Sequence, residues 1–175
     1  MNEILAINGG PQAFDEEVSR YNSIGKEETN AAINVLKSGV LSQFLGEWDS
    51  DFYGGPQVKK FENRWSNYFN VKHSVSVNSC TSGLMVALGA IGIEPGDEVI
   101  VSTWTMCASA TAILVWNAIP VFADIEDQTF NLDPNSIEKN ITPYTKAIIV
   151  TNIFGHAAKL KEIKAIAKKH KLKVI

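Results

Sequence analysis

The sequence predicts an α/β protein in which a parallel sheet carries helices on its faces. Two observations indicate this class. The 175 residues are 45% hydrophobic and 20% charged, which is the composition of a globular domain with a sizeable core. From residue 73 onward, short apolar runs alternate with segments of helical periodicity. Strands that are separated by single helices need crossover connections, and such strands pair in parallel.

The first 69 residues predict two helices joined by a long loop. The stretch "KEETNAAINVLKSG" has apolar residues at helical spacing, acids early and Gly39 as a stop, so we expect a helix at about 27–38. The aromatic-rich segment 40–55, "VLSQFLGEWDSDFYGG", has no period and predicts an ordered surface loop. Pro56 suits a first helical turn, and apolar residues then recur every three or four positions, which predicts a helix at 57–69.

The rest of the chain predicts strands and helices in alternation. The expected strands are "HSVSV" (73–77), "DEVIVS" (97–102), "IPVFADI" (119–125), "KAIIVTNI" (146–153) and the start of another in "KLKVI" (171–175). The expected helices are 82–91, 106–116, 134–140 and 158–170. A strand that stops after so few residues is a poor place for a domain to end, so we expect a fragment. The alternative is a complete domain with this strand at the edge of its sheet.

Charge and cysteine content narrow the range of partners. A net charge of −3 without a concentrated positive patch gives no footprint for nucleic acid or an anionic membrane surface. The longest apolar stretch, "ASATAILVWNAIPVFA", is interrupted by Asn117 and Pro120 and is shorter than the roughly 20 residues that span a bilayer. Two cysteines, Cys80 and Cys107, do not make a disulfide framework, so we expect a reducing, cytoplasmic setting.

The strand-to-helix turns are the candidate sites, because ligands of open α/β sheets bind outside the carboxyl ends of the strands. The turn "NSCTSG" (78–83) has small side chains, hydroxyl donors and the free N–H groups of the following helix, which are the ingredients of an anion site. It is neither a Walker A motif nor a dinucleotide fingerprint. An ordinary helix cap at Ser79 or Thr81 explains the same residues equally well, so the residues alone leave both interpretations open.

The remaining turns give weaker signals. Trp104 and Met106 in the second turn carry groups that pack well on a planar ligand, although periodicity alone favours core positions for them. Cys80 has no identifiable base within reach, so small buried thiols are the better interpretation of Cys80 and Cys107. No spacing of His, Cys, Asp and Glu predicts a metal site.

Taken together, these segments resemble the DegT/DnrJ/StrS family of sugar aminotransferases, which are fold type I pyridoxal-phosphate enzymes. The resemblance runs from "GGPQVKKFE" to Ile175, and "GIEPGDEVIV", "IPVFADIE", "ITPYTKAI" and "AIAKKHKLKVI" occur in the family's order and spacing. It implies a three-layer sandwich with a mostly parallel central sheet, truncated in this chain. Residues 1–55 would form an N-terminal helix and substrate-side loop, and residues 56–175 part of the cofactor-binding large domain.

Carried over residue by residue, the resemblance implies a site for pyridoxal 5'-phosphate. The family's phosphate-holding turn matches residues 80–82, which makes the Thr81 hydroxyl and the Ser82 amide the expected phosphate donors. Met106 stands where the family usually stacks an aromatic residue on the pyridine ring, and a thioether can also cover a ring face. Asn152 stands where many members have a histidine near the cofactor.

The resemblance also implies the activity of the intact protein. Such an enzyme transfers an amino group from glutamate or glutamine to a keto-sugar, usually nucleotide-linked, and works as a homodimer. Leu41 and Ser42 are the expected substrate-binding residues. The Schiff-base lysine and the aspartate for the pyridine nitrogen are expected beyond Ile175, so no catalytic residue is named. A sugar dehydratase of the same family and a non-catalytic binding or regulatory protein are the alternatives.

Overall fold

The computed structural model describes residues 4–14, 16–17 and 19–175, and it divides the chain into two compact units. The first unit is Met1–Ser74 and the second is Val75–Ile175. The helix expected at 57–69 therefore groups with the N-terminal segment.

Two helices and a closed loop make up most of the first unit. Helix α1 (Lys26–Ser38) follows Gly25 and ends at Gly39, whose left-handed backbone has a φ of 71°. Helix α2 (Pro56–Phe69) begins with its proline, as expected for a first turn. The loop between them is ordered, because the Gly54 N–H donates to the Gln43 carbonyl at 2.7 Å and closes its ends.

The second unit is built on a four-stranded sheet. The strands lie in the order β2-β1-β3-β4, and every neighbouring pair is parallel. Their bounds are Glu98–Ser102 for β1, Ile119–Ala123 for β2, Thr145–Ile148 for β3 and Lys173–Val174 for β4. Four of the five expected strands and their parallel pairing are therefore confirmed.

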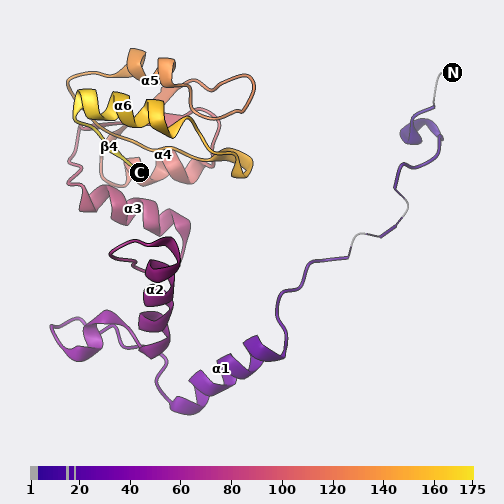
Figure 1. The fold of residues 1–175 in the computed structure, drawn as a ribbon, viewed down its shortest axis with the longest axis vertical. Coiled ribbons are helices and arrows are strands. Elements are labelled where there is room, and N and C mark those ends of the chain that lie inside the picture. Colours follow the sequence, from indigo (N-terminus) through magenta and orange to yellow (C-terminus); the bar gives the residue numbers. More distant parts are fainter. Residues whose placement is uncertain (1–3, 15, 18) are drawn as a thin grey trace. The chain divides into compact units, whose positions relative to one another are not determined.

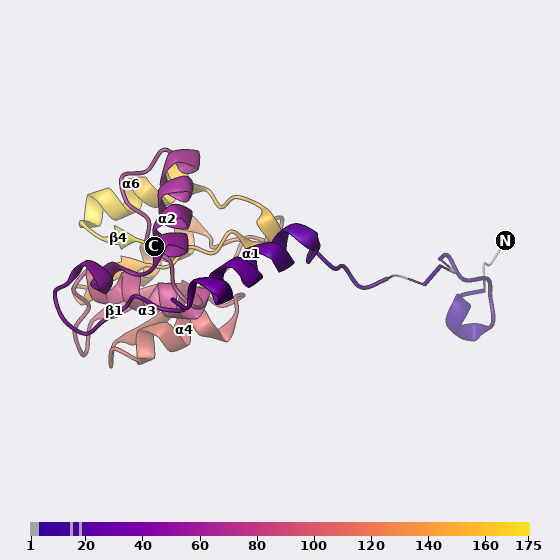
Figure 2. The ribbon, with the colours of Figure 1, turned by 90° about the horizontal axis from the view of Figure 1, so that it is seen from below.

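Helices cover both faces of this sheet (Figure 1): α3 (Cys80–Ala90), α4 (Cys107–Leu114), α5 (Pro134–Asn140) and α6 (Leu160–His170). Val99 and Val101 of β1 join the core under α3 and α4, whereas Ile100 joins the core under α5 and α6, because successive side chains of a strand point to opposite faces. Helices α3 and α4 lie side by side (Figure 2). The three-layer sandwich is confirmed, and the expected helices have ends within two residues of the observed ones.

The strand expected at 73–77 is wrong. The backbone of these residues is not assigned to a strand, and the sheet of the described residues contains no partner for it. Val75 and Val77 are 75% and 43% exposed. The alternating pattern of "HSVSV" favours an extended chain, but a strand also needs a neighbour to pair with, and a local pattern carries no information about that neighbour.

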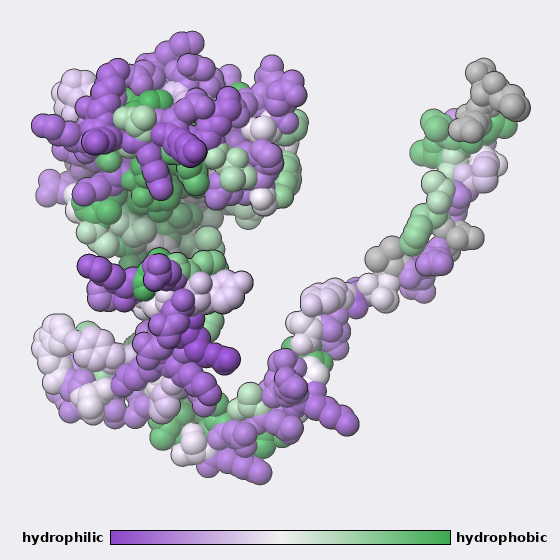
Figure 3. All heavy atoms as spheres, in the orientation of Figure 1, coloured by the Kyte–Doolittle hydropathy of each residue, from purple (hydrophilic) through white to green (hydrophobic). Residues whose placement is uncertain are grey.

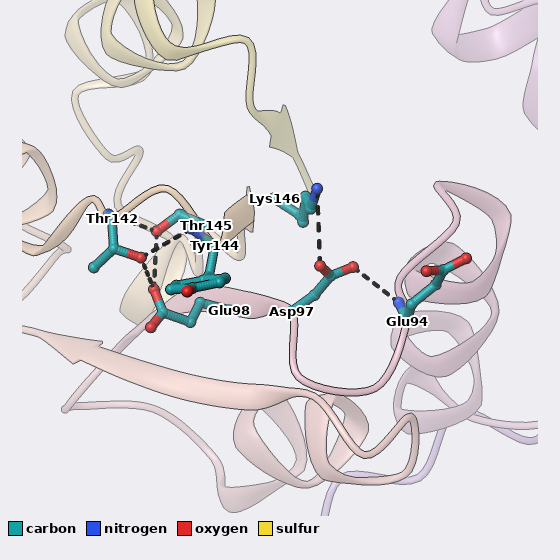
Figure 4. A network of polar contacts seen from close by, with 7 residues as sticks. All are labelled: Glu94, Asp97, Glu98, Thr142, Tyr144, Thr145 and Lys146. Carbon is teal, nitrogen blue, oxygen red and sulfur yellow. Dashed lines mark hydrogen bonds and ion pairs between the residues drawn. The ribbon is translucent and has the colours of Figure 1, made fainter.

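Polar contacts close the amino-terminal edge of the sheet (Figure 4). At the start of β1, the Glu98 carboxylate accepts hydrogen bonds from the hydroxyls of Thr142 and Thr145. Lys146 of β3 forms an ion pair with Asp97 at 3.8 Å. These contacts join β1 to the segment around β3 at the edge opposite the strand-to-helix turns.

Gly89 of α3 lies against the indole ring of Trp116, and we predict that alanine destabilises the fold there. A Cβ atom at this position would lie 2.4 Å from the ring, and the Trp116 Nε1–H group donates to the Met85 carbonyl at 3.0 Å. The gain of about 1 kcal/mol in helix propensity is outweighed by an overpacking cost of about 1–3 kcal/mol. Gly89→Ala should lower the midpoint of urea unfolding. Gly83→Ala, whose Cβ meets Val77 at 3.4 Å, is the control, and a raised midpoint for Gly89→Ala would contradict the predicted clash.

Glu138 of α5 links its helix to α6, whose outer face is hydrophilic (Figure 3). Its carboxylate accepts from Lys169 and lies 3.0 Å from the His170 ring nitrogen, and these two hydrogen bonds hold its pKa below the usual value. A carboxyl group with a depressed folded-state pKa adds stability above its unfolded pKa, and the gain is lost as the pH falls through the folded pKa.

Glu138→Gln should therefore lower the melting temperature at neutral pH, and the difference from the wild type should shrink as the pH is lowered. A melting series from pH 7 into the acid range measures this. The control is Glu94→Gln, because the Glu94 carboxylate has no hydrogen bond or ion pair among the described residues. A pH-independent effect of Glu138→Gln would contradict the electrostatic role.

Candidate functional site

The candidate site lies at the carboxyl edge of the parallel sheet, where turns lead from the strands into the next helices. The turn before α3 belongs to the same edge. Ile91 and Gly92, which follow the end of α3, line a cavity together with Asp97 and Lys146 at the amino-terminal edge. The start of α3 therefore points to the carboxyl edge, where the predicted phosphate site is expected.

Ser79 is the N-cap of α3. Its Oγ accepts a hydrogen bond from the Ser82 N–H at 3.1 Å and lies 3.0 Å from the Ser82 hydroxyl. The cap interpretation of this turn is therefore correct for Ser79. The Ser82 amide serves the cap, so an anion would compete with Ser79 for it.

The cap does not use the Thr81 hydroxyl or the first two N–H groups of α3. Among the described residues, no acceptor is found for this hydroxyl or for the N–H groups of Cys80 and Thr81. The peptide dipoles of α3, which has 11 residues, add up along the helix, so its first turn carries a partial positive charge. Free N–H groups, a hydroxyl and small side chains at a helix start fit a phosphate group.

Trp104 and Met106 are not core residues. Their exposed fractions are 52% and 73%, which corrects the expectation from periodicity. The buried Ser102 hydroxyl holds the backbone of this turn. It accepts a hydrogen bond from the Trp104 N–H at 3.1 Å and donates one to the Trp104 carbonyl at 3.2 Å. The Trp104 ring lies 6.0 Å from that of Phe130 in the next turn. Both predicted ring-packing side chains are thus available to a ligand.

The Thr105 hydroxyl connects the second turn to the end of β3. It lies 2.9 Å from the Ser109 hydroxyl in α4 and 3.1 Å from the Thr151 hydroxyl. Thr105 is the neighbour of Met106, and Thr151 is the neighbour of Asn152. Sequence reasoning missed this bridge, because its two ends are 46 residues apart.

Asn152 is exposed and takes part in the turn before α6. Its Oδ1 accepts from the Ala158 N–H at 3.0 Å, which leaves the two protons of Nδ2 without an acceptor among the described residues. The side-chain amide can therefore still donate to a ligand.

Asn131 joins the third turn to the fourth and was also missed. It is 1% exposed; its Nδ2 donates to the His156 carbonyl and its Oδ1 accepts from the Ile153 N–H, each at 3.2 Å. The backbones of Phe130 and Phe154 beside it have φ values of 58° and 53°, which are uncommon for bulky residues. The only signal in the sequence was that Asn131, a polar residue, lies in the turn after the strand expected at 119–125.

Lys159 adds an ionic contact between the same two turns. Its ammonium group lies 2.5 Å from the Glu126 carboxylate. The hydrogen bond and the charge of Glu126 raise the pKa of Lys159 above its usual value. Lys159 is therefore held as a cation in this contact, which argues against a role as a proton acceptor.

The two cysteines are exposed, so the expectation of buried thiols is wrong. Cys80 is the first residue of α3 and Cys107 is the first residue of α4. First helical residues at the carboxyl edge face the open turns instead of the core, and this explains the exposure.

Leu41 and Ser42 line a cavity of about 290 Å³ within the first unit. The end of α1 and the start of α2 form its other walls. Gln43 at its margin is fixed by a hydrogen bond of 3.0 Å from its Nε2 to the Asp51 carboxylate. The structure thus places the two predicted substrate residues together in one concave surface.

The described residues contain neither a candidate metal site nor a membrane-spanning helix. They contain no group of three or more His, Cys, Asp or Glu residues that could hold a metal ion. None of their helices is both long enough and apolar enough to span a membrane.

Residues 22–175 match the DegT/DnrJ/EryC1/StrS aminotransferase family. The chain belongs to this family. The resemblance in the sequence was placed from residue 54 onward, but the match starts at residue 22. It therefore includes α1 and the loop that carries Leu41 and Ser42.

Two relatives and one solved structure show what this family member is similar to. The spore coat polysaccharide biosynthesis protein SpsC of Bacillus subtilis (strain 168) is 41% identical over 152 residues, which are 87% of this chain and 36% of the relative. The UDP-2-acetamido-2-deoxy-3-oxo-D-glucuronate aminotransferase of Pseudomonas aeruginosa is 40% identical over 121 residues, 69% of this chain and 34% of the relative. The crystal structure of NtdA from Bacillus subtilis with bound cofactor PMP is 34% identical, with a TM-score of 0.73 over 91% of this chain and 37% of that one. The chain spans about a third of the length of these relatives.

Proposed function

We propose that this chain is the cofactor-binding part of a pyridoxal-phosphate-dependent aminotransferase that moves an amino group from glutamate or glutamine to a keto-sugar. The family match over residues 22–175 carries the proposal. The relative from Pseudomonas aeruginosa is named for a UDP-linked oxo-sugar substrate, which supports a nucleotide-linked sugar. The solved relative with bound PMP supports the cofactor.

The residues at the carboxyl edge fit this cofactor. In the proposal, the Thr81 hydroxyl and the Ser82 amide bind its phosphate, the latter in competition with the Ser79 cap. Met106 covers a face of the pyridine ring, and the free Nδ2 group of Asn152 donates near the ring edge. Leu41 and Ser42 contact the sugar. When bound, the cofactor supplies an electron-withdrawing ring that stabilises the charge developing on the amino-bearing carbon.

The Schiff-base lysine is not assigned to any residue of this chain. Two lysines of the matched segments have other contacts, Lys146 with Asp97 and Lys159 with Glu126. The chain covers 36% of SpsC, so we propose that the lysine belongs to a part of the protein not included here and that the chain alone is inactive. The full protein is proposed to be a cytoplasmic homodimer.

Amino transfer by the full-length protein tests the proposal. The assay supplies pyridoxal phosphate, glutamate or glutamine and a nucleotide-linked keto-sugar, and mass spectrometry follows the amino-sugar and the keto acid from the donor. Equal amounts of both products are expected. Loss of water from the sugar without a keto acid would favour the dehydratase alternative. Cofactor binding without either product would favour a binding or regulatory protein.

A further inference from the structure

We infer that Thr105 is a positioning residue whose hydroxyl fixes the distance between Met106 and Asn152, and thereby the gap that receives the cofactor ring. The inference rests on the proposed function. It starts from the chain of three hydroxyls in which Thr105 lies between Ser109 at 2.9 Å and Thr151 at 3.1 Å. Thr105 thereby joins the second turn to the fourth.

The packing around this bridge makes it rigid. Ser109 is 5% exposed, and its N–H donates to the Met106 carbonyl at 3.0 Å, so the hydroxyl chain is anchored in the first turn of α4. On the other side, Thr151 lies three residues beyond the end of β3, and between them the Ile149 N–H still donates to the Ile100 carbonyl of β1 at 2.8 Å. One end of the bridge therefore belongs to α4, and the other follows closely on the sheet.

The neighbours of the bridge are the residues that the proposed function assigns to the cofactor. Met106 follows Thr105 and is 73% exposed, and Asn152 follows Thr151 and is also exposed. A hydroxyl contact between residues 105 and 151 holds the backbones from which these two side chains project. Loss of this contact keeps the Met106 and Asn152 side chains in the protein but allows their two turns to move apart. Binding of a ligand that contacts both side chains should then be weaker.

Valine and serine at position 105 separate the hydroxyl from the side-chain volume. Valine keeps the shape of threonine and removes the hydroxyl, whereas serine keeps the hydroxyl. The probe is pyridoxamine 5'-phosphate, which needs no lysine, and its dissociation constant is measured by calorimetry on the full-length protein freed of cofactor. Thr105→Val should weaken binding about tenfold, which corresponds to roughly one hydrogen bond. Thr105→Ser should bind within about threefold of the wild type.

Further variants and a hydrogen-exchange measurement separate positioning from a general effect on stability. Thr111→Val is the control, because the Thr111 hydroxyl donates only to the Cys107 carbonyl of its own helix, at 2.9 Å. It should leave the affinity unchanged. Thr151→Val removes only the contact with Thr105, so it should also weaken binding. The double variant should bind no more weakly than Thr105→Val, because that substitution already removes the contact between residues 105 and 151. Hydrogen exchange at residues 150–153 of the ligand-free chain should rise in Thr105→Val and not in Thr105→Ser.

The outcomes distinguish this inference from the proposed function. If the wild type binds pyridoxamine 5'-phosphate and Thr105→Val binds equally well, the positioning role is overturned and the proposed function stands. Additive effects of Thr105→Val and Thr151→Val would also overturn it. If the full-length wild-type protein does not bind the probe, the cofactor site itself is overturned, and the inference falls with it.

Discussion

Thr81→Val is expected to weaken the binding of pyridoxamine 5'-phosphate to the chain by about 10- to 100-fold, because a hydrogen bond to a charged group contributes about 1.5–3 kcal/mol. The Thr81 hydroxyl has no acceptor among the described residues, so its removal should leave the free energy of unfolding within about 0.5 kcal/mol of the wild type. Calorimetric titration and urea unfolding of the same preparation measure the two quantities.

Ser79→Ala is the matched control, and its effects should be the reverse. The Ser79 hydroxyl caps α3, so its removal should cost about 1 kcal/mol of stability. It also releases the Ser82 amide, so the affinity for the probe should not fall. If Ser79→Ala loses affinity and Thr81→Val loses stability, the assignment of cap and phosphate donor is wrong.

Asn131→Ala is expected to lower the free energy of unfolding by about 2–3 kcal/mol, because the substitution removes two hydrogen bonds and leaves a cavity at a buried position. The bonds are those from Nδ2 to His156 and from the Ile153 N–H to Oδ1. Their loss should also release the turn with the left-handed Phe154. Urea unfolding gives the stability, and hydrogen exchange at residues 153–156 gives the local effect.

Asn135→Ala is the control for Asn131, since Asn135 is an exposed residue whose side chain donates to Asp133 at 3.2 Å. It should change the stability by no more than about 0.5 kcal/mol. Equal effects of the two substitutions would contradict the role given to Asn131.

Most of the fold was predictable because its signals are local. The run around Ile100 is apolar at consecutive positions, as a strand covered on both faces requires, and Pro134 after Asp133 marks the start of α5. The strand at 73–77 failed because pairing is not local. Val77 has the pattern of a strand residue without a partner strand among the described residues.

The candidate site was predictable only in part. The helix start at Ser79 followed from cap chemistry, and the carboxyl edge followed from the parallel sheet. Asn131 and Thr105 were missed because they act across 22 to 46 residues of sequence, which no periodicity records. The exposure of Cys80 depends on which edge of the sheet its helix faces, and a residue-type preference does not contain that information.

The central claim is that the start of α3 holds the phosphate of the cofactor, and a comparison of two ligands tests it most directly. The full-length protein, freed of cofactor, is titrated with pyridoxamine 5'-phosphate and with pyridoxamine, which lacks the phosphate. We predict saturable binding of the first, competition by inorganic phosphate, and binding of the second that is weaker by at least about tenfold. Equal affinity for the two ligands, or no effect of Thr81→Val on the difference between them, would contradict it.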